Sequence, residues 1–400
     1  MKILFLSRWF PYPPDNGSKI RILNVVKQLA RRHDVALLAF AEATDPVDAR
    51  TLLALREYCS RVRVVPYRSF HPRSARAALG FLSPRPRWLV DTQSDSMRAA
   101  VAREFGAQHA DLVVASQLAM VPYAVALRGA PALMEELEIS AFHDAVGPRE
   151  PVARRLRSLL TWFKLGAYLR NVLPRFRACT VASDLEKRRL QLVAPRYGDV
   201  AVIPNAVDLT GYAGDFGAAR PNTLVFSGAL TYAANYDAAS HFLSRIHPLI
   251  QDAVPEVVLR VTGAHTGVDL SSLPSRRGVL YTGYVADIRP VIGRSWVSVV
   301  PLRRGGGTRL KIVESLALGT PVVSTSKGAE GLDVTDGVDI LLADDPRAFA
   351  DRVVELLRSP ELRCRLAANG RRLVESKYDW QIVGQDLRTL VDRITPFGPG

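Results

Sequence analysis

Cysteine is scarce in this sequence, whose 400 residues include only Cys59, Cys179 and Cys364. Three cysteines so far apart predict neither a disulfide framework nor a metal cluster, and they fit a reducing cytosol. No uninterrupted apolar run approaches the roughly 18 residues of a membrane-spanning helix. The opening MKILFLSRWFPYPP is too short for a signal peptide and lacks a small-residue cleavage site. We therefore expect a cytoplasmic protein that begins with a strand.

Acidic residues are few beside the basic ones, with 39 Asp and Glu against 53 Lys and Arg and a net charge of +14. Residues 1–200 hold 31 basic and 18 acidic residues, whereas residues 201–400 hold 22 and 21. The basic first half predicts an anionic membrane or a lipid phosphate as its partner. No nucleic-acid-binding motif accompanies the charge, so we expect no nucleic-acid partner. An arginine-rich proteome is the alternative explanation of the charge.

Apolar strands alternate with helical patterns along the chain, which predicts an α/β fold. A strand, a glycine-containing loop, a helix and a second strand follow one another between Lys2 and Phe40, the opening of a doubly wound sheet. The same order begins again with the apolar run Thr223 to Ser227 and Gly228. A chain of this length predicts two or three domains.

The rest of the chain is organised around the run VVPLRRGGGTRLKIVESLALGTPVVSTSKGAEGL, which starts at Val299. A strand ends at Pro301, and three glycines follow. Thr308 is expected to cap a helix that Gly319 ends. Glycines let a backbone approach a ligand closely, and a helix N-terminus favours an anion.

Four cations surround this turn: Arg303, Arg304, Arg309 and Lys311. The dipole of a helix disfavours cations in its first turn, so a bound anion would explain Arg309 and Lys311. The turn therefore predicts a phosphate site. The alternative is a glycine turn with solvated arginines.

The run resembles the donor-binding signature of retaining glycosyltransferases with the GT-B fold, in the large bacterial polysaccharide and lipopolysaccharide family (group 1, family 4). Glu314, Leu316–Ala317, Gly319 and Pro321–Val323 match the second half of that signature. Gly306 stands where most of the family has a first Glu, which usually holds hydroxyls of the donor sugar. The chain resembles instead the branch with Gly-Gly-Thr-Arg-x-Lys, which is associated with exopolysaccharide synthesis.

The resemblance implies two Rossmann-like, doubly wound domains that face each other across a cleft. It implies an acceptor-binding domain over residues 1–206 and a nucleotide-sugar-binding domain over 207–376. Residues 377–400 would form a helix and tail that cross back to the first domain.

The resemblance also implies a donor site. Glu314 would hold the ribose, and the Gly-Tyr-Val segment after a strand would read the nucleobase. Ala229 replaces the family's usual Arg, so Arg303, Arg309 and Lys311 are expected to meet the diphosphate charge. The expected donor-binding residues are Gly17, Ser18, Gly228, Asn235, Gly263, Gly283, Tyr284, Val285, Arg303, Gly305, Gly306, Gly307, Thr308 and Leu310. The expected catalytic residues are Arg309, Lys311, Glu314 and His143.

The segment ALMEELEISAFHD, residues 132–144, carries Glu135, Glu136 and Glu138, one of which is expected to orient an acceptor hydroxyl, and His143, which is expected to contact the donor sugar. In the family, the corresponding loop supplies polar residues close to the transferred sugar. A solvated start of a helix is the alternative, and the sequence leaves open which glutamate lies in the site.

Two basic segments of the first half mix cations with apolar or aromatic residues, 67–88 and 149–177. Such segments suit a membrane interface. Each also fits a surface helix that packs on its own domain.

The resemblance thus implies transfer of a hexosyl unit from a UDP- or GDP-sugar, with retention of configuration, to an oligosaccharide or lipid-linked acceptor in polysaccharide biosynthesis. It contains no Asp-x-Asp, so we expect no metal and no other cofactor. The expected place is the cytoplasm, peripheral on the cytoplasmic face of the inner membrane. The alternatives are a nucleotide-sugar epimerase of the same fold, which needs no acceptor, and a non-catalytic nucleotide-sugar-binding protein.

Overall fold

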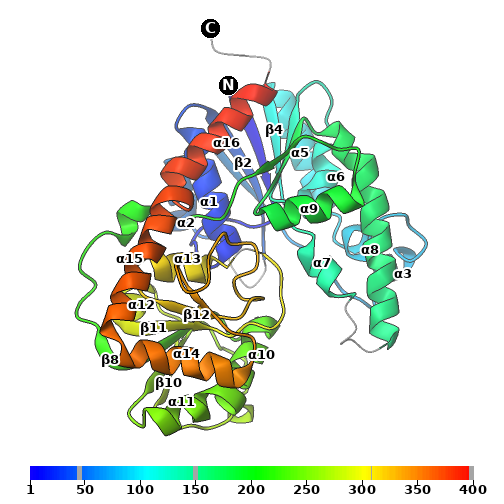
Figure 1. The fold of residues 1–400 in the computed structure, drawn as a ribbon. Helices are drawn as coiled ribbons and strands as arrows, with labels where there is room; N and C mark the ends of the chain where they lie inside the picture. The colour runs from blue at the N-terminus through cyan, green and yellow to red at the C-terminus, as the bar shows by residue number, and fades with distance from the viewer. Residues whose placement is uncertain (43–46, 147–151, 308, 396–400) are drawn as a thin grey trace. The chain divides into compact units, whose positions relative to one another are not determined.

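The computed structural model describes residues 1–42, 47–146, 152–307 and 309–395. The chain divides into two compact units. The first comprises Met1–Pro204 and the residues from Gly384 on, and the second comprises Asn205–Val383. The predicted domain boundaries, after residues 206 and 376, lie close to these two points, at which the chain passes from one unit to the other. Each unit is built on one parallel sheet with helices against it (Figure 1).

The sheet of the first unit has seven parallel strands whose apolar side chains are mostly buried. In spatial order the strands are β3 (Arg61–Pro66), β2 (Asp34–Ala41), β1 (Lys2–Ser7), β4 (Leu112–Ser116), β5 (Ala132–Glu135), β6 (Ala178–Val181) and β7 (Val200–Val202). The strand β1 pairs with both β2 and β4, so the order reverses between β1 and β4. In open α/β sheets, ligands bind at the carboxyl ends of the strands beside such a reversal.

The sheet of the second unit repeats this winding with six parallel strands. In spatial order they are β10 (Val279–Gly283), β9 (Val258–Thr262), β8 (Arg220–Ser227), β11 (Ser295–Val300), β12 (Val322–Ser324) and β13 (Leu341–Leu342). Here β8 pairs with β9 and with β11, which places the reversal between β8 and β11. The loops after β8 and β11 therefore meet at the edge where a ligand is expected.

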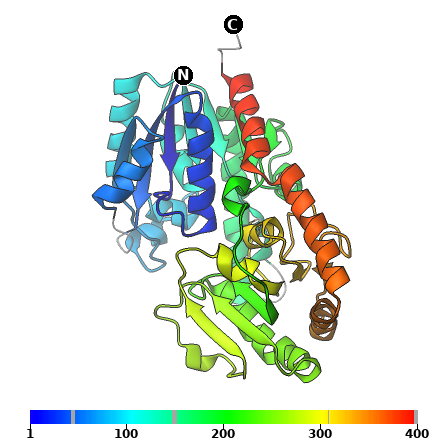
Figure 2. The same cartoon turned by 90° about the vertical axis from the view of Figure 1, so that its left-hand side faces the viewer.

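The helices of the first unit connect its strands and cover the sheet. They are α1 (Gly17–Ala30), α2 (Ala49–Arg56), α3 (Ala75–Leu79), α4 (Arg87–Asp91), α5 (Asp95–Gln108), η1 (Leu118–Met120), α6 (Val121–Ala124), α7 (Ser140–Asp144), α8 (Val152–Val172), η2 (Leu173–Arg175) and α9 (Asp184–Val193). Side chains cap several of them: Asn16 accepts from the amide of Lys19 in α1, and Ser183 accepts from that of Glu186 in α9. Figure 2 shows α1, in blue, against the strands that it connects.

The helices of the second unit are η3 (Leu209–Tyr212), α10 (Ala233–His241), the π-helical η4 (Phe242–Ile246), α11 (His247–Ala253), η5 (Leu270–Ser272), α12 (Arg289–Gly293), α13 (Leu310–Ala317), α14 (Pro346–Arg358) and α15 (Pro360–Lys377). The last helix, α16 (Trp380–Ile394), begins in the second unit and continues into the first. Gly384 of α16 lies so close to Gln28 of α1 that a Cβ there would be 2.3 Å from the Gln28 amide carbon.

The predicted α/β fold with two doubly wound, Rossmann-like sheets is confirmed. The long basic segment 149–177 proves to be mainly one helix, α8. Residues 147–151 of that segment lie outside the described part of the chain.

Candidate active site

Three glycines that the sequence predicts for the donor site end the neighbouring strands β8, β9 and β10. Gly228, Gly263 and Gly283 have φ values of 145°, 135° and 70°, which L side chains rarely adopt. The amide of Gly228 donates to Thr262 (2.8 Å), and the amide of Gly263 donates to Gly283 (2.9 Å). A Cβ on Gly263 would lie 2.5 Å from the carbonyl of Gly228. Glycine is therefore required where these loops meet.

Lys311 and Asn235 lie side by side against the first of these loops. The ammonium of Lys311, on α13, donates to Oδ1 of Asn235, on α10, at 3.0 Å. The same amide donates from Nδ2 to the carbonyl of Ala229 (2.9 Å). A Cβ on Gly228 would lie only 2.6 Å from Nζ of Lys311. Two predicted residues from distant parts of the sequence thus bring a cation to the backbone at the β8 end.

Burial controls the charge of Lys311. Desolvation, and after it the nearby Arg309 guanidinium, lower its pKa to about 7, although Glu314 acts in the opposite direction. A lysine in this state gains its full charge when an anion binds beside it. The position is therefore suited to a phosphate ligand.

Glu314 faces inward on α13, one turn beyond Lys311. Its Oε1 accepts a hydrogen bond from the hydroxyl of Tyr212 at 2.9 Å. Burial raises the pKa of the Glu314 carboxyl, while the Tyr212 hydroxyl and the Lys311 ammonium act in the opposite direction. The side chain is half-buried and is held in a fixed orientation.

The glycine-rich turn before α13 has a single arginine folded back on it. Arg309 donates from Nη2 to the carbonyl of Gly305 (2.6 Å) and from Nη1 to that of Gly306. The φ values of Gly305 and Gly307 are 106° and 76°, so the turn needs glycine at both positions. Leu310 begins the helix and is buried, and the predicted cap Thr308 lies outside the described residues.

The other two cations of the turn have an acidic neighbour. Arg303 donates to both carboxylate oxygens of Asp237, on α10, at 2.8 and 3.2 Å. Arg304 forms an ion pair with the same carboxylate at 3.2 Å. Asp237 therefore neutralises part of the charge that the sequence assigns to a phosphate.

Two buried hydroxyls at the same edge lack a hydrogen-bond partner within the residues that the structure describes. They belong to Ser227, at the end of β8, and Thr262, at the end of β9. Buried polar groups are normally bonded, and an orphaned one needs an explanation. A bound ligand or water at this edge would supply the partner.

At the edge of the first sheet, Glu135 ends β5 and is fully buried. It accepts from Nε of Arg21 on α1 at 2.8 Å and from the hydroxyl of Ser116 at 2.7 Å. Glu136 is also buried, adopts a φ of 53°, and accepts from the side-chain amide of Gln117 at 3.1 Å. The alternative of a solvated helix start is therefore wrong for these two glutamates, because a strand end places them inside the domain.

Glu135 and Glu136 differ in what they can do. Arg21 and Ser116 hold the carboxylate of Glu135 as a structural group. The pKa of Glu136 is raised to about 8, mainly by desolvation. The Arg21 guanidinium lowers this pKa, whereas the Glu135 and Glu138 carboxylates raise it. Glu136 can therefore carry a proton near neutral pH, and a protonated carboxyl can donate a hydrogen bond to a hydroxyl oxygen.

The remaining predicted residues lie at accessible places in their own units. The side chain of His143 is half-exposed, with its ring edge-on to Trp162 at 5.5 Å. Gly17 and Ser18 are the first two residues of α1, with Gly17 exposed. Tyr284, directly after β10, is 61% exposed, and Val285 is half-buried.

Sequence patterns missed several partners. Tyr212, Asp237 and Arg21 each bond or pair with a side chain far away in the sequence, from 66 to 114 residues. A buried cation within the apolar face of a helix, as for Arg21, is a usable signal, because such a charge needs a partner. No local pattern marks Tyr212 or Asp237.

Neither a metal cluster nor a membrane span is found within residues 1–42, 47–146, 152–307 and 309–395. No three His, Cys, Asp or Glu side chains there are arranged to hold a metal ion. No helix among them has the length and apolar character needed to cross a bilayer.

Comparison with protein families adds an independent finding. Residues 221–359, which include β8, α10 and α13, match the family model described as "Glycosyl transferases group 1". The phosphatidyl-myo-inositol mannosyltransferase of Mycobacterium leprae is 35% identical over 160 residues, which are 38% of this chain and 42% of that protein. A GDP-mannose-dependent mannosyltransferase of Corynebacterium glutamicum is 28% identical over 112 residues, 26% of this chain and 29% of that protein. The matched segments span between 22% and 42% of the curated relatives' length.

Solved structures agree with the fold over nearly the whole chain. HepE of Anabaena, in complex with UDP and glucose, is similar with a TM-score of 0.67 at 17% identity, over 98% of this chain and 100% of that one. Sucrose-phosphate synthase of Thermosynechococcus elongatus has a TM-score of 0.70 at 16% identity, over 98% and 99%. At such identities the likeness shows the fold. The family match and the named mannosyltransferases support the predicted glycosyltransferase.

Proposed function

We propose that the chain transfers a hexosyl unit from a UDP- or GDP-sugar to a saccharide or lipid-linked saccharide, with retention of configuration, in the synthesis of a cell-envelope polysaccharide. The observation that carries the proposal is the cluster of Gly228, Asn235, Lys311 and Glu314 at the edge between β8 and β11. It joins a tight glycine backbone, a half-buried cation and an oriented carboxylate where doubly wound sheets bind nucleotides.

In this proposal the diphosphate lies against the β8 loop and the turn before α13. When the bond between the anomeric carbon and the phosphate oxygen breaks, negative charge develops on the departing nucleoside diphosphate. The ammonium of Lys311 and the guanidinium of Arg309 would stabilise that charge. A new bond forms between the anomeric carbon and the acceptor oxygen, and the acceptor proton passes to the departing phosphate.

Glu314 would accept hydrogen bonds from the ribose hydroxyls, and the segment Gly283 to Val285 would face the nucleobase. In the first unit, Glu136 is the group proposed to orient an acceptor hydroxyl, and His143 is proposed to contact the donor sugar. Glu135 is left out of this role, because Arg21 and Ser116 already hold its carboxylate.

Transfer is tested by incubating the purified chain with UDP- and GDP-hexoses and lipid-linked saccharide acceptors, with product analysis by NMR of the anomeric proton. The proposal expects a glycoside of the donor's own configuration, and strongly reduced transfer by Lys311→Met. Conversion of the donor sugar without an acceptor would favour the epimerase. Nucleotide binding without any turnover would favour the binding protein.

The acceptor proposal includes peripheral contact with an anionic membrane on its cytoplasmic face. The start of α8 is the supporting feature, since every residue from Val152 to Arg157 is exposed. The turn after α3 lies beside this helix, because Lys164 donates to the carbonyl of Phe81 at 2.6 Å. Leu82 in that turn is 89% exposed and Phe163 on α8 is 70% exposed.

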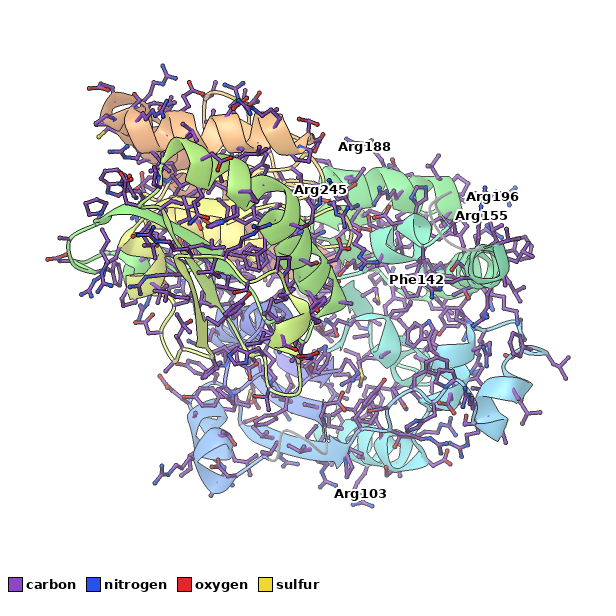
Figure 3. The ribbon with its side chains drawn as sticks, turned by 90° about the horizontal axis from the view of Figure 1, so that it is seen from below. Arg103, Phe142, Arg155, Arg188, Arg196 and Arg245 are labelled. Atoms are coloured by element: carbon purple, nitrogen blue, oxygen red, sulfur yellow. The ribbon has the colours of Figure 1, made fainter. Side chains whose placement is uncertain are left out.

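Apolar and basic side chains share this face. The exposed large apolar residues of the two segments are Leu79, Phe81, Leu82, Val152, Leu156, Leu159, Leu160 and Phe163. Neither α8 nor residues 68–90 contain an acidic residue. Figure 3 shows Arg155 of α8 and Arg188 of α9 at the outer surface of this unit. Cations beside apolar side chains match a lipid surface, where each cation adds about 1 kcal/mol.

Vesicle flotation tests the membrane contact. The chain should float with vesicles that contain about a third phosphatidylglycerol and remain behind with pure phosphatidylcholine. The pair Leu82→Ser and Phe163→Ser should abolish flotation, whereas Leu192→Ser, which changes an equally exposed leucine on α9, should not. Equal behaviour of the wild type with both kinds of vesicle would contradict the contact.

A further inference from the structure

The segment that joins the two sheets is fastened to the second unit by arginines. Arg289 donates to the carbonyl of Gly211, Arg371 to that of Tyr212 (3.3 Å), and Arg294 to that of Phe216 (2.7 Å). Within residues 211–216, Gly211, Tyr212 and Phe216 are half-buried. Side chains of α12, of α15 and of Arg294, which follows α12, fix the position of the backbone. It is therefore an ordered part of the second unit rather than a loose connection.

This fastened segment reaches the proposed donor site through one hydroxyl. Tyr212 ends η3, and its hydroxyl donates to Oε1 of Glu314 on α13 at 2.9 Å. Across the described ranges, this is the one hydrogen bond that the Glu314 carboxylate receives. The tyrosine therefore fixes one carboxylate oxygen and leaves Oε2 for another donor.

The pKa shifts of Tyr212 and Glu314 fit this hydrogen bond. Burial and the neighbouring Glu314 raise the pKa of the Tyr212 phenol, so it stays protonated and can only donate toward the carboxylate. The donated bond favours the ionised form of Glu314 against the opposing effect of burial. Without the hydroxyl, the carboxyl would lose both its orientation and part of its charge.

A second contact of the same segment leads to the proposed nucleobase loop. Arg289, which donates to Gly211, also grips the carboxylate of Asp287 with two bonds of 2.8 and 2.9 Å. Asp287 lies four residues after Gly283, at the end of the loop that follows β10. The segment thus contacts the carboxylate assigned to the ribose directly, and Arg289 links it to the end of the loop assigned to the base.

We infer that Tyr212 is a positioning residue of the nucleotide site: its hydroxyl orients Glu314 so that the free carboxylate oxygen accepts from the ribose hydroxyls of a nucleoside diphosphate. This rests on the proposed function, in which Glu314 holds the ribose. The inference assigns part of the donor site to the segment between the sheets, outside the glycine-rich turn and its helix.

Calorimetric titration of Tyr212→Phe tests this inference, with UDP and GDP as probes and the 2′-deoxy and 3′-deoxy forms of whichever binds. Phenylalanine keeps the ring and removes only the hydroxyl. The variant should bind the ribonucleotide about 5- to 10-fold more weakly, which is less than the full effect of a hydrogen bond to a charged group, because Tyr212 acts on the nucleotide only through Glu314. For the deoxy form that lacks the hydroxyl bonded to Glu314, the variant and the wild type should have nearly the same affinity. In turnover, KM should rise and kcat should change little.

Two further variants separate the possible failures. Tyr197→Phe removes a hydroxyl that donates to the carbonyl of Phe176 in the first unit, and it should bind every probe as the wild type does. Glu314→Gln should weaken ribonucleotide binding. If Glu314→Gln weakens binding and Tyr212→Phe does not, the positioning role is wrong while the proposed function stands.

Equal weakening of ribo- and deoxynucleotide binding by Tyr212→Phe would also overturn the inference, because a merely structural role affects all ligands alike. If the wild type binds neither UDP nor GDP, the proposed function itself fails. The pH profile gives an independent readout: in Tyr212→Phe, the pH at which binding reaches half its maximum on the acid side should move upward.

Discussion

The half-buried ammonium of Lys311 makes the affinity for the donor depend on pH. Its pKa in the free protein is about 7, because burial and Arg309 disfavour the charged form. A diphosphate bound beside it would restore the pKa toward the ordinary value of about 10.4. The pKa is therefore lower in the free protein than in the complex, and binding above pH 7 takes up a proton. Affinity is greatest below pH 7 and falls as the pH rises.

The size of this effect follows from the two pKa values. With a pKa near 7 free and about 10.4 bound, the dissociation constant should rise about 25-fold between pH 6.5 and 8.5. At pH 8 binding should take up about 0.9 proton. A nucleotide sugar is the right ligand, because its diphosphate does not titrate in this range.

Calorimetry in two buffers of different ionisation enthalpy measures both quantities. Lys311→Met should bind more weakly and show an almost flat profile over the same range. A flat profile for the wild type, or the same slope in Lys311→Met, would refute the assignment of this lysine to the diphosphate.

Three further changes test other parts of the structure. Gly263→Ala should lower both the melting temperature and the nucleotide affinity, because its Cβ meets the Gly228 backbone. The control Gly106→Ala, in open space on α5, should leave the melting temperature unchanged or raise it slightly, and equal effects of the two changes would contradict the packing argument. Arg21→Met should lower the free energy of unfolding by about 3–5 kcal/mol in urea, because it strands the buried Glu135, whereas a loss below about 1 kcal/mol would contradict a structural pair. Chelator should leave transfer unchanged, and activity lost to chelator and restored by Mg²⁺ or Mn²⁺ would contradict the metal-free prediction.

Local sequence patterns were sufficient for most of the fold. Continuous apolar runs produce buried strands, and turn residues mark their ends, so the order of strands and helices follows from short segments. Gly319, with a φ of 67°, ends α13 where the pattern predicts. The β8 and β11 loops were recognisable as candidate ligand loops because each follows a strand of a doubly wound sheet.

Long-range pairing limited what could be predicted of the candidate site. The direction of Lys311 toward Asn235 depends on packing between α13 and α10, 76 residues apart in sequence. The same holds for Arg303, which a pattern assigns to a phosphate and the structure pairs with Asp237. The sequence leaves open whether Glu135 lies in the site or in solvent, because its partner, Arg21, is 114 residues away. Periodicity reveals which face of an element is buried, but it does not reveal which distant polar group meets it.

Nucleotide-dependent stabilisation of the folded chain tests the central claim most directly. Thermal shift with UDP, GDP and ADP should show stabilisation by one of them, about 2.7 kcal/mol at a hundred times its dissociation constant. The shift should vanish in Arg309→Ala and Glu314→Ala and persist in Arg347→Ala, which removes a cation from an exposed ion pair on α14. A well-folded wild type that none of the three nucleotides stabilises would contradict a donor site in the second unit.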